Sequence, residues 1–271
     1  IGSSSLMSST PAIWFTDFGQ GSDAPIRLFT FAHAGGGAGV FSKWNKALPG
    51  THVLATRLPG RESRIAEPAY PAMDALIDTL AQQIAPRLDR PFVFYGHSLG
   101  GLIAVELTHR LRKLGLRQPE RLLIGATRSP DRKSPHPQLH ALADADLVKG
   151  LGRYGNMSQS IVDSPELMIM LLPMLRADFS LVETYAYRER APLDRPIVVY
   201  YGNDDRMVDP ADMEGWRTKS SADVRLQPIE AGHLFHLTHE AELLTMIGAE
   251  LQRPAGGPAI IAGKAIPATI G

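Results

Sequence analysis

The stretch PFVFYGHSLGGLIAVEL, residues 91–107, decides the fold. Pro91–Tyr95 is an apolar, β-leaning run, and the residues after the turn have a helical period, so the stretch predicts a strand, a sharp turn and a helix. Gly96 and Gly100 flank Ser98 and leave room for a strained turn, because glycine adds no side-chain bulk. We expect the Ser98 hydroxyl to point out above a sheet, at the amino end of the helix, where N–H groups and the helix dipole favour a developing negative charge. The alternative is a surface turn with an inert serine, which the clear strand and helix on either side disfavour.

Further apolar runs recur along the chain, with helical stretches between most of them. This alternation predicts the α/β class, with a mostly parallel central sheet flanked by helices. Ligands of such sheets bind beyond the carboxyl ends of the strands, so the loops that follow the runs are where chemistry is expected. The expected strands are Ile13–Phe18, Ile26–Phe31, His52–Thr56, Pro91–Tyr95, Arg121–Ala126, Pro196–Tyr201 and Val224–Ile229, and the expected helices include Met73–Leu88, Leu99–Leu114 and Thr238–Leu251.

Composition excludes several classes of function. The 28 basic and 28 acidic residues give a net charge of zero, which argues against a nucleic-acid partner. The chain has no cysteine, which excludes disulfides, thiolate metal sites and a cysteine nucleophile and fits a reducing cytoplasm. No apolar run approaches the roughly 20 residues that span a bilayer, so we expect a soluble, cytoplasmic protein without a membrane partner.

Domain organisation is expected to be simple. No linker-like stretch divides the interior of the 271 residues, so residues 12–252 are predicted to form one domain. Residues 1–6 are interpreted as a vector remnant, with Met7 as a plausible native start. Residues 254–271 form a small, apolar tail to which we assign no role.

Residues 133–190 interrupt the alternation of strands and helices. Helical patterns without a strand run predict an all-helical insertion, which we interpret as a lid over the active-site edge. Within it, Leu167–Leu175 is apolar almost all round. Two interpretations stay open, a segment that lines a substrate chamber and a plain buried core helix. Pro173 is expected to kink this helix.

A base must accompany Ser98, because a serine hydroxyl is a poor nucleophile near neutral pH. His233 is the best-placed histidine, since it follows the seventh apolar run and precedes the last helix. The recurrence of His233, His236 and His239 raises a metal cluster as an alternative. Spacing of i, i+3, i+6 drifts around a helix and no HExxH pattern appears, so we expect neither a metal nor another cofactor.

The acid that orients the base is expected in the loop after Pro196–Tyr201, which carries both Asp204 and Asp205. We favour Asp205, because the spacing Gly-x-x-Asp-x-x-Val from Gly202 to Val208 is found in many hydrolases of this shape. Asp204 would then be its solvent-facing neighbour. This choice depends on resemblance more than on physical argument.

Two backbone N–H groups are needed to hold a tetrahedral oxyanion. The candidates are the N–H of Leu99, directly after the serine, and that of Ala34 in the loop HAGGGAG, residues 33–39. A dinucleotide or phosphate loop is disfavoured, because neither a Gly-x-Gly-x-x-Gly spacing nor a Gly-Lys-Ser/Thr ending is present. A flexible turn without a catalytic part remains open.

Taken together, the motifs make the chain resemble a type II thioesterase of the α/β-hydrolase superfamily, a free-standing editing enzyme of polyketide and nonribosomal peptide synthesis. The order and spacing follow that family from about residue 12 to 252. One departure is Ala32, where the family usually carries proline. The matching segments are FAHAGGGAGVFSKW, TRLPGRESR, YGHSLGG, LRADFSLVETY, YGNDDRMV, DMEGW and AGHLFHL.

The resemblance implies hydrolysis of acyl groups bound as thioesters to the phosphopantetheine arm of carrier proteins, by a monomer. It implies that Ser98 forms an acyl-enzyme, His233 acts as base and then acid, Asp205 orients it, and the Leu99 and Ala34 N–H groups hold the oxyanion. A carboxylesterase acting on small free esters and a non-catalytic binding protein of the same fold are the alternatives.

Two loops at the expected carboxyl edge are basic. Carrier proteins are typically acidic, so these loops either steer docking or are ordinary solvated surface, and both interpretations stay open. The basic residues are Arg57, Arg61 and Arg64 in the first loop and Arg128, Arg132 and Lys133 in the second.

Overall fold

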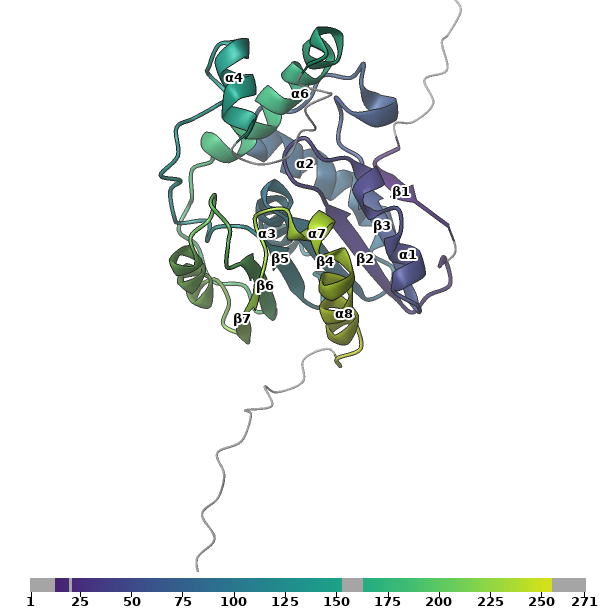
Figure 1. Cartoon of the computed structure of the whole chain (residues 1–271). Coiled ribbons are helices and arrows are strands. Elements are labelled where there is room, and N and C mark those ends of the chain that lie inside the picture. The colour runs from purple at the N-terminus through teal and green to yellow at the C-terminus, as the bar shows by residue number, and fades with distance from the viewer. Residues whose placement is uncertain (1–12, 20, 153–162, 255–271) are drawn as a thin grey trace, which may run out of the picture.

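A computed structural model describes residues 13–19, 21–152 and 163–254. The interpretations given above to residues 1–6, Met7 and the tail from residue 255 lie outside the described residues. The described chain folds around a seven-stranded sheet in the order β1-β3-β2-β4-β5-β6-β7. Six strands are mutually parallel and β1 pairs antiparallel with β3 at one edge, so the predicted α/β class is confirmed (Figure 1). The strands are β1 Phe15–Asp17, β2 Ile26–Phe31, β3 Thr51–Thr56, β4 Phe92–His97, β5 Leu122–Gly125, β6 Ile197–Gly202 and β7 Val224–Ile229.

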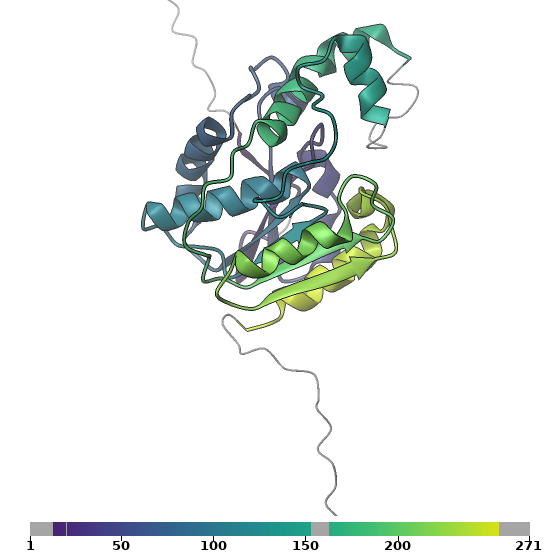
Figure 2. The same ribbon diagram turned by 90° about the vertical axis from the view of Figure 1, so that its left-hand side faces the viewer.

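Helices cover both faces of the sheet (Figures 1 and 2). Strand residues alternate between the faces, so Phe94 packs with the core under α2 and α3, while Val93 and Tyr95 pack with the core under α1 and α8. Burial on both sides explains why these strands are near-continuous apolar runs in the sequence. The helices are α1 Trp44–Ala47, α2 Met73–Ile84, α3 Leu99–Lys113, α4 Asp144–Leu151, α6 Pro165–Glu183, α7 Phe235–Thr238 and α8 Glu240–Leu251, with 3-10 helices η1 Ala38–Phe41, η2 Glu62–Arg64, η3 Ala85–Arg87 and η5 Pro210–Thr218.

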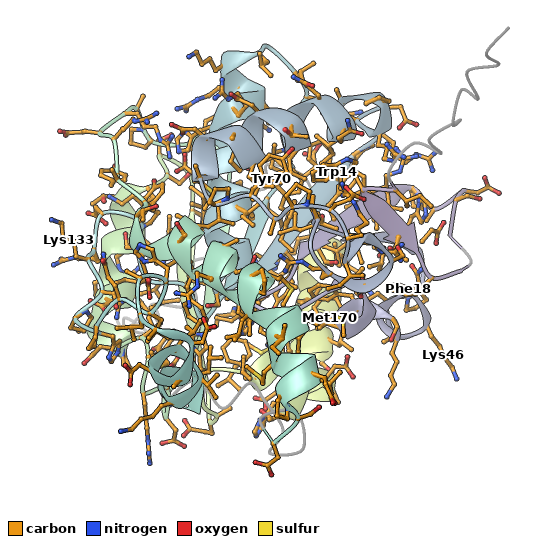
Figure 3. The ribbon with its side chains drawn as sticks, turned by 90° about the horizontal axis from the view of Figure 1, so that it is seen from above. Trp14, Phe18, Lys46, Tyr70, Lys133 and Met170 are labelled. Atoms are coloured by element: carbon orange, nitrogen blue, oxygen red, sulfur yellow. The ribbon has the colours of Figure 1, made fainter. Side chains whose placement is uncertain are left out.

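The segment between β5 and β6 contributes α4 and α6, which lie beyond one end of the strands of the sheet (Figures 1 and 2). Seen from above, α6 crosses over the sheet, with Met170 on its amino-terminal half (Figure 3). Pro173 does not interrupt this helix, which runs on through it. Among the helices of the described residues, none has the length and hydropathy that a membrane crossing requires.

Candidate active site

The turn between β4 and α3 has the strained backbone expected for it. Ser98 has φ 55° and ψ −116°, a conformation that L-residues rarely adopt. The flanking glycines allow close approach of main chain: a Cβ on Gly96 would lie 2.1 Å from the Gly100 oxygen, and one on Gly100 would lie 2.0 Å from the Phe31 oxygen. Both positions therefore exclude any side chain, and Ser98 is held at the amino end of α3.

Three side chains from distant segments form one hydrogen-bonded chain. His233 Nε2 lies 3.0 Å from Ser98 Oγ, and His233 Nδ1 lies 2.8 Å from Asp205 Oδ2. A carboxylate only accepts, so Nδ1 carries the proton and donates it to Asp205. The Nε2 lone pair then faces the serine and accepts its hydroxyl proton, which is the arrangement a general base needs.

The two neighbouring aspartates differ in environment. Asp205 is buried, and its Oδ1 accepts from the N–H groups of Met207 at 2.7 Å and Val208 at 3.1 Å, so its carboxylate is fixed from both sides. Asp204 is exposed. The loops carrying the acid and the base touch directly, since a Cβ on Gly202 would lie 2.2 Å from the Ala231 oxygen. The structure thus brings Asp205, and not Asp204, to His233.

The loop after β2 lies beside the serine. Leu99 is the first residue of α3, so its N–H has no carbonyl one turn earlier with which to bond. Ala34 is buried in the loop after β2, and among the described residues its N–H donates to no protein acceptor. The next residue, Gly35, has φ 80°, a conformation that favours glycine.

A buried ion pair ties this loop to α6. Asp178 of α6 is 1% exposed and accepts from the Gly35 N–H at 2.8 Å and from both terminal nitrogens of Arg61 at 2.6 and 2.9 Å. Arg61 also donates to the Gly36 oxygen at 2.8 Å. The helix of the insertion and the loop after β3 therefore hold the Ala34 loop jointly. The sequence analysis did not assign this role; the signal was a carboxylate, Asp178, in a helix that is mostly apolar.

Both interpretations of the first basic loop, docking and solvated surface, are wrong for two of its three arginines, which are buried. Arg61 is used as just described, and Arg64 is buried against the Trp14 ring at 4.2 Å while paired with Glu67. Arg57 pairs with Glu62.

In the second basic loop, Arg128 is half-buried and pairs with Asp212, whereas Arg132 and Lys133 are exposed. Lys133 points away from the molecule in Figure 3.

The apolar segment of α6 is not buried all round. Met168, Leu172, Met174 and Leu175 are buried, but Ile169 is 72% exposed. The interpretation as a plain core helix is therefore wrong for its amino-terminal half. Leu175 packs against the loop that carries Ala34, since a Cβ on Gly35 would be 2.8 Å from its Cδ2.

Neither cofactor alternative fits the described residues. In residues 13–19, 21–152 and 163–254 there is no group of three or more metal-binding side chains, and His236 bonds to His33 while His239 bonds to Thr238. In the glycine loop, Glu62 accepts from the Gly39 N–H at 2.8 Å. A carboxylate at that place would repel a pyrophosphate, which agrees with the missing dinucleotide spacing.

Comparison with known proteins gives a consistent result. Residues 26–251 match the family model described as a thioesterase domain. The protein named linear gramicidin dehydrogenase LgrE from Brevibacillus parabrevis is 34% identical over 247 residues, which are 90% of this chain and 94% of that protein. The type II thioesterase BorB from the borrelidin biosynthetic cluster has a TM-score of 0.81 at 31% identity, covering 90% of this chain and 100% of that one. The thioesterase RedJ from the prodiginine pathway of Streptomyces coelicolor has a TM-score of 0.80 at 27% identity, covering 90% and 98%.

Proposed function

The chain belongs to the thioesterase family, and from this premise we propose that it is a type II thioesterase that hydrolyses acyl groups from the phosphopantetheine arm of carrier proteins. Its fold is the α/β-hydrolase fold expected from the sequence. Two further solved structures, ClbQ at 27% identity and YbtT at 26% identity, are described as coming from NRPS/PKS pathways, which supports a role in polyketide or nonribosomal peptide assembly. The observation that carries the proposal is the continuous chain Ser98–His233–Asp205, with distances of 3.0 and 2.8 Å.

In the proposed reaction, Ser98 Oγ attacks the thioester carbonyl carbon while His233 Nε2 takes the hydroxyl proton. The carbonyl oxygen becomes an oxyanion and accepts hydrogen bonds from the Leu99 and Ala34 N–H groups. Collapse of this intermediate breaks the carbon–sulfur bond, and His233 returns the proton to the pantetheine thiolate. Asp205 holds His233 in the tautomer that both transfers need.

Water completes the cycle. It attacks the acyl-enzyme, His233 takes one of its protons, and the second tetrahedral intermediate releases a free acid as the proton returns to Ser98. Atoms balance as one thioester plus one water giving one acid and one thiol.

Above this site, we propose that residues 133–190 act as a lid on the single domain of residues 12–252. We also propose that the exposed residues Arg132 and Lys133 of the second basic loop contact the acidic carrier protein.

Mass spectrometry of carrier protein loaded with short and long acyl chains tests the proposal. The wild-type enzyme is expected to convert acyl-carrier to the free-thiol carrier, and Ser98→Ala is expected to abolish the conversion. Parallel assays with p-nitrophenyl esters identify the alternatives. A strong preference for free esters over acyl-carrier protein would point to a general carboxylesterase. Equal rates of hydrolysis for wild type and Ser98→Ala would indicate a binding protein. A dehydrogenase reaction, which the name of LgrE gives for that protein, would also contradict the proposal.

A further inference from the structure

Four imidazoles meet beneath the active site, and the reaction proposed above uses only one. His33, His97 and His236 are 6%, 0% and 0% exposed, beside His233 at 8%. The rings of His97 and His236 stack at 3.6 Å, and those of His33 and His236 meet at 4.7 Å. Burying an imidazole costs free energy unless its nitrogens find hydrogen-bond partners. Four buried imidazoles therefore indicate a role other than filling space in the core.

His97 holds the main chain of the catalytic histidine. Its Nε2 lies 2.7 Å from the His233 carbonyl oxygen, which only accepts, so Nε2 carries the proton. Burial holds the pKa of His97 well below its ordinary value, so the ring is neutral and its Nδ1 accepts from the Tyr95 hydroxyl at 3.0 Å. The tautomer of His97 is thereby fixed.

His236 joins the loop of the catalytic histidine to residues 33–39, the loop that carries Ala34 and is called the oxyanion loop from here on. Its Nε2 lies 2.8 Å from Nδ1 of His33, the residue directly before Ala34. The other ring nitrogen of His236, Nδ1, is buried without a partner among the described residues. A buried N–H without an acceptor is rarer in proteins than an unused acceptor, so the proton belongs on Nε2 and His236 donates to His33.

We propose that His236 is a positioning residue, which fixes the oxyanion loop against the His233 loop by donating its Nε2 proton to His33. This proposal deepens the function proposed above and rests on it. His236 lies three residues after His233, and His33 immediately precedes the proposed oxyanion donor Ala34. This hydrogen bond of 2.8 Å therefore links the segment that carries the base, His233, to the loop whose Ala34 N–H is proposed to stabilise the oxyanion.

Two sides hold the oxyanion loop in different ways. Asp178 and Arg61 hold Gly35 and Gly36 from the lid side, and His236 holds His33 from the side of the sheet. The lid contact does not involve His233. Among the described residues, the His236 hydrogen bond joins the segment of the catalytic histidine to this loop, so its loss should affect the transition state more than substrate binding.

The test compares His236→Leu, which removes the donor at similar volume, with His236→Gln, whose amide nitrogen can keep it. His236→Leu is expected to lower kcat by about 10- to 100-fold, because small misplacements of reacting groups cost about that much. KM should not change, and the acid limb of the kcat/KM profile should keep its midpoint, since His233 remains paired with Asp205. His236→Gln should recover most of the loss. His239→Gln is the matched control, a histidine of the same segment outside the cluster.

Inhibition by an alkyl boronic acid gives a second readout. Its tetrahedral adduct on Ser98 places an oxyanion between the Leu99 and Ala34 N–H groups, so its affinity should weaken in His236→Leu by the same factor as kcat. Approaching from the other end, His33→Leu should reproduce the defect and His33→Asn, which keeps an acceptor, should not. The double variant His33→Leu/His236→Leu should be no worse than either single variant, because both remove one contact.

Equal kcat and boronate affinity in His236→Leu and wild type would overturn the proposal. So would a loss that follows the melting temperature and is not recovered by His236→Gln, or a shifted acid limb, which would mean that His236 acts on the ionisation of His233. Labelling of Ser98 by a fluorophosphonate keeps the test separate from the proposed substrate. If wild type is labelled but leaves acyl-carrier intact, the proposed function fails while the boronate comparison still decides the role of His236.

Discussion

Removal of the Asp178 carboxylate should destabilise the protein more than most single changes. In Asp178→Leu the Arg61 guanidinium, 5% exposed, would remain buried without its counter-charge, which costs about 3–5 kcal/mol in comparable pairs. The Gly35 N–H would lose its acceptor, at a further cost of about 1–3 kcal/mol. We therefore expect the free energy of unfolding to fall by at least about 4 kcal/mol, with a loss of kcat because the oxyanion loop is no longer held.

Urea unfolding, followed by circular dichroism, measures this change. The double variant Arg61→Met/Asp178→Leu should be more stable than Asp178→Leu alone, because no uncompensated charge stays buried. Asp144→Ala is the matched control in the same insertion; its ion pair with Arg176 involves a carboxylate side chain that is 70% exposed, so the change should stay below about 1 kcal/mol. A loss below about 1 kcal/mol for Asp178→Leu, or a double variant less stable than the single one, would refute the reasoning.

Three further outcomes are expected. Burial, and to a lesser degree the charges of His233 and Arg61, lower the pKa of His33 from 6.5 to about 4. Between these pH values the unfolded chain binds a proton that the fold excludes, so the free energy of unfolding should fall as pH drops, with His33 alone contributing up to about 1.4 kcal/mol per pH unit. The lowered pKa values of His97 and His236 act in the same direction, and urea titrations giving the same stability at both ends would contradict this. Asp205→Asn should lower kcat by about 10⁴-fold by stabilising the wrong tautomer of His233, while Asp204→Asn should leave kcat unchanged; the reverse pattern would reassign the acid. Gly100→Ala should lower the melting temperature by about 5–10 °C or prevent folding, because its Cβ would overlap the Phe31 oxygen. Gly248→Ala should not, since its Cβ would meet Leu48 at an ordinary 3.7 Å, and equal melting temperatures for the two variants would rule out the close approach.

The strands were predictable because their physical cause is local. A parallel strand buried on both faces must be apolar over its whole length, and such runs are visible without knowledge of their neighbours. The exception is β1, which is shorter than the predicted run Ile13–Phe18: it pairs only with β3, and Ile13 is 57% exposed. An edge strand has one partner, so its length depends on contacts that a single segment does not reveal.

Within the proposed site, residue type and chain order pointed to Ser98 and His233, since the sharp turn and the loops at the carboxyl edge restrict the choice. The preference for Asp205 over Asp204 came from resemblance. Sequence patterns failed where a role depends on a partner far along the chain. Arg61 was interpreted as an exposed residue, either for docking or as solvated surface, because its counter-charge, Asp178, lies 117 residues away. His236 was considered only as a metal ligand, since its partner His33 is 203 residues distant.

The neutral state of the buried imidazoles has a consequence for proton transfer. Burial lowers the pKa of His33 to about 4 and those of His97 and His236 well below their ordinary value, so near neutral pH none of the three competes for a proton with the ring beside it. In the reaction proposed above, a proton that His233 takes from Ser98 would therefore stay on that ring until it is returned to the leaving thiolate. Three buried histidines thus lie near the proposed base without acting as a proton relay, because burial disfavours their protonated forms.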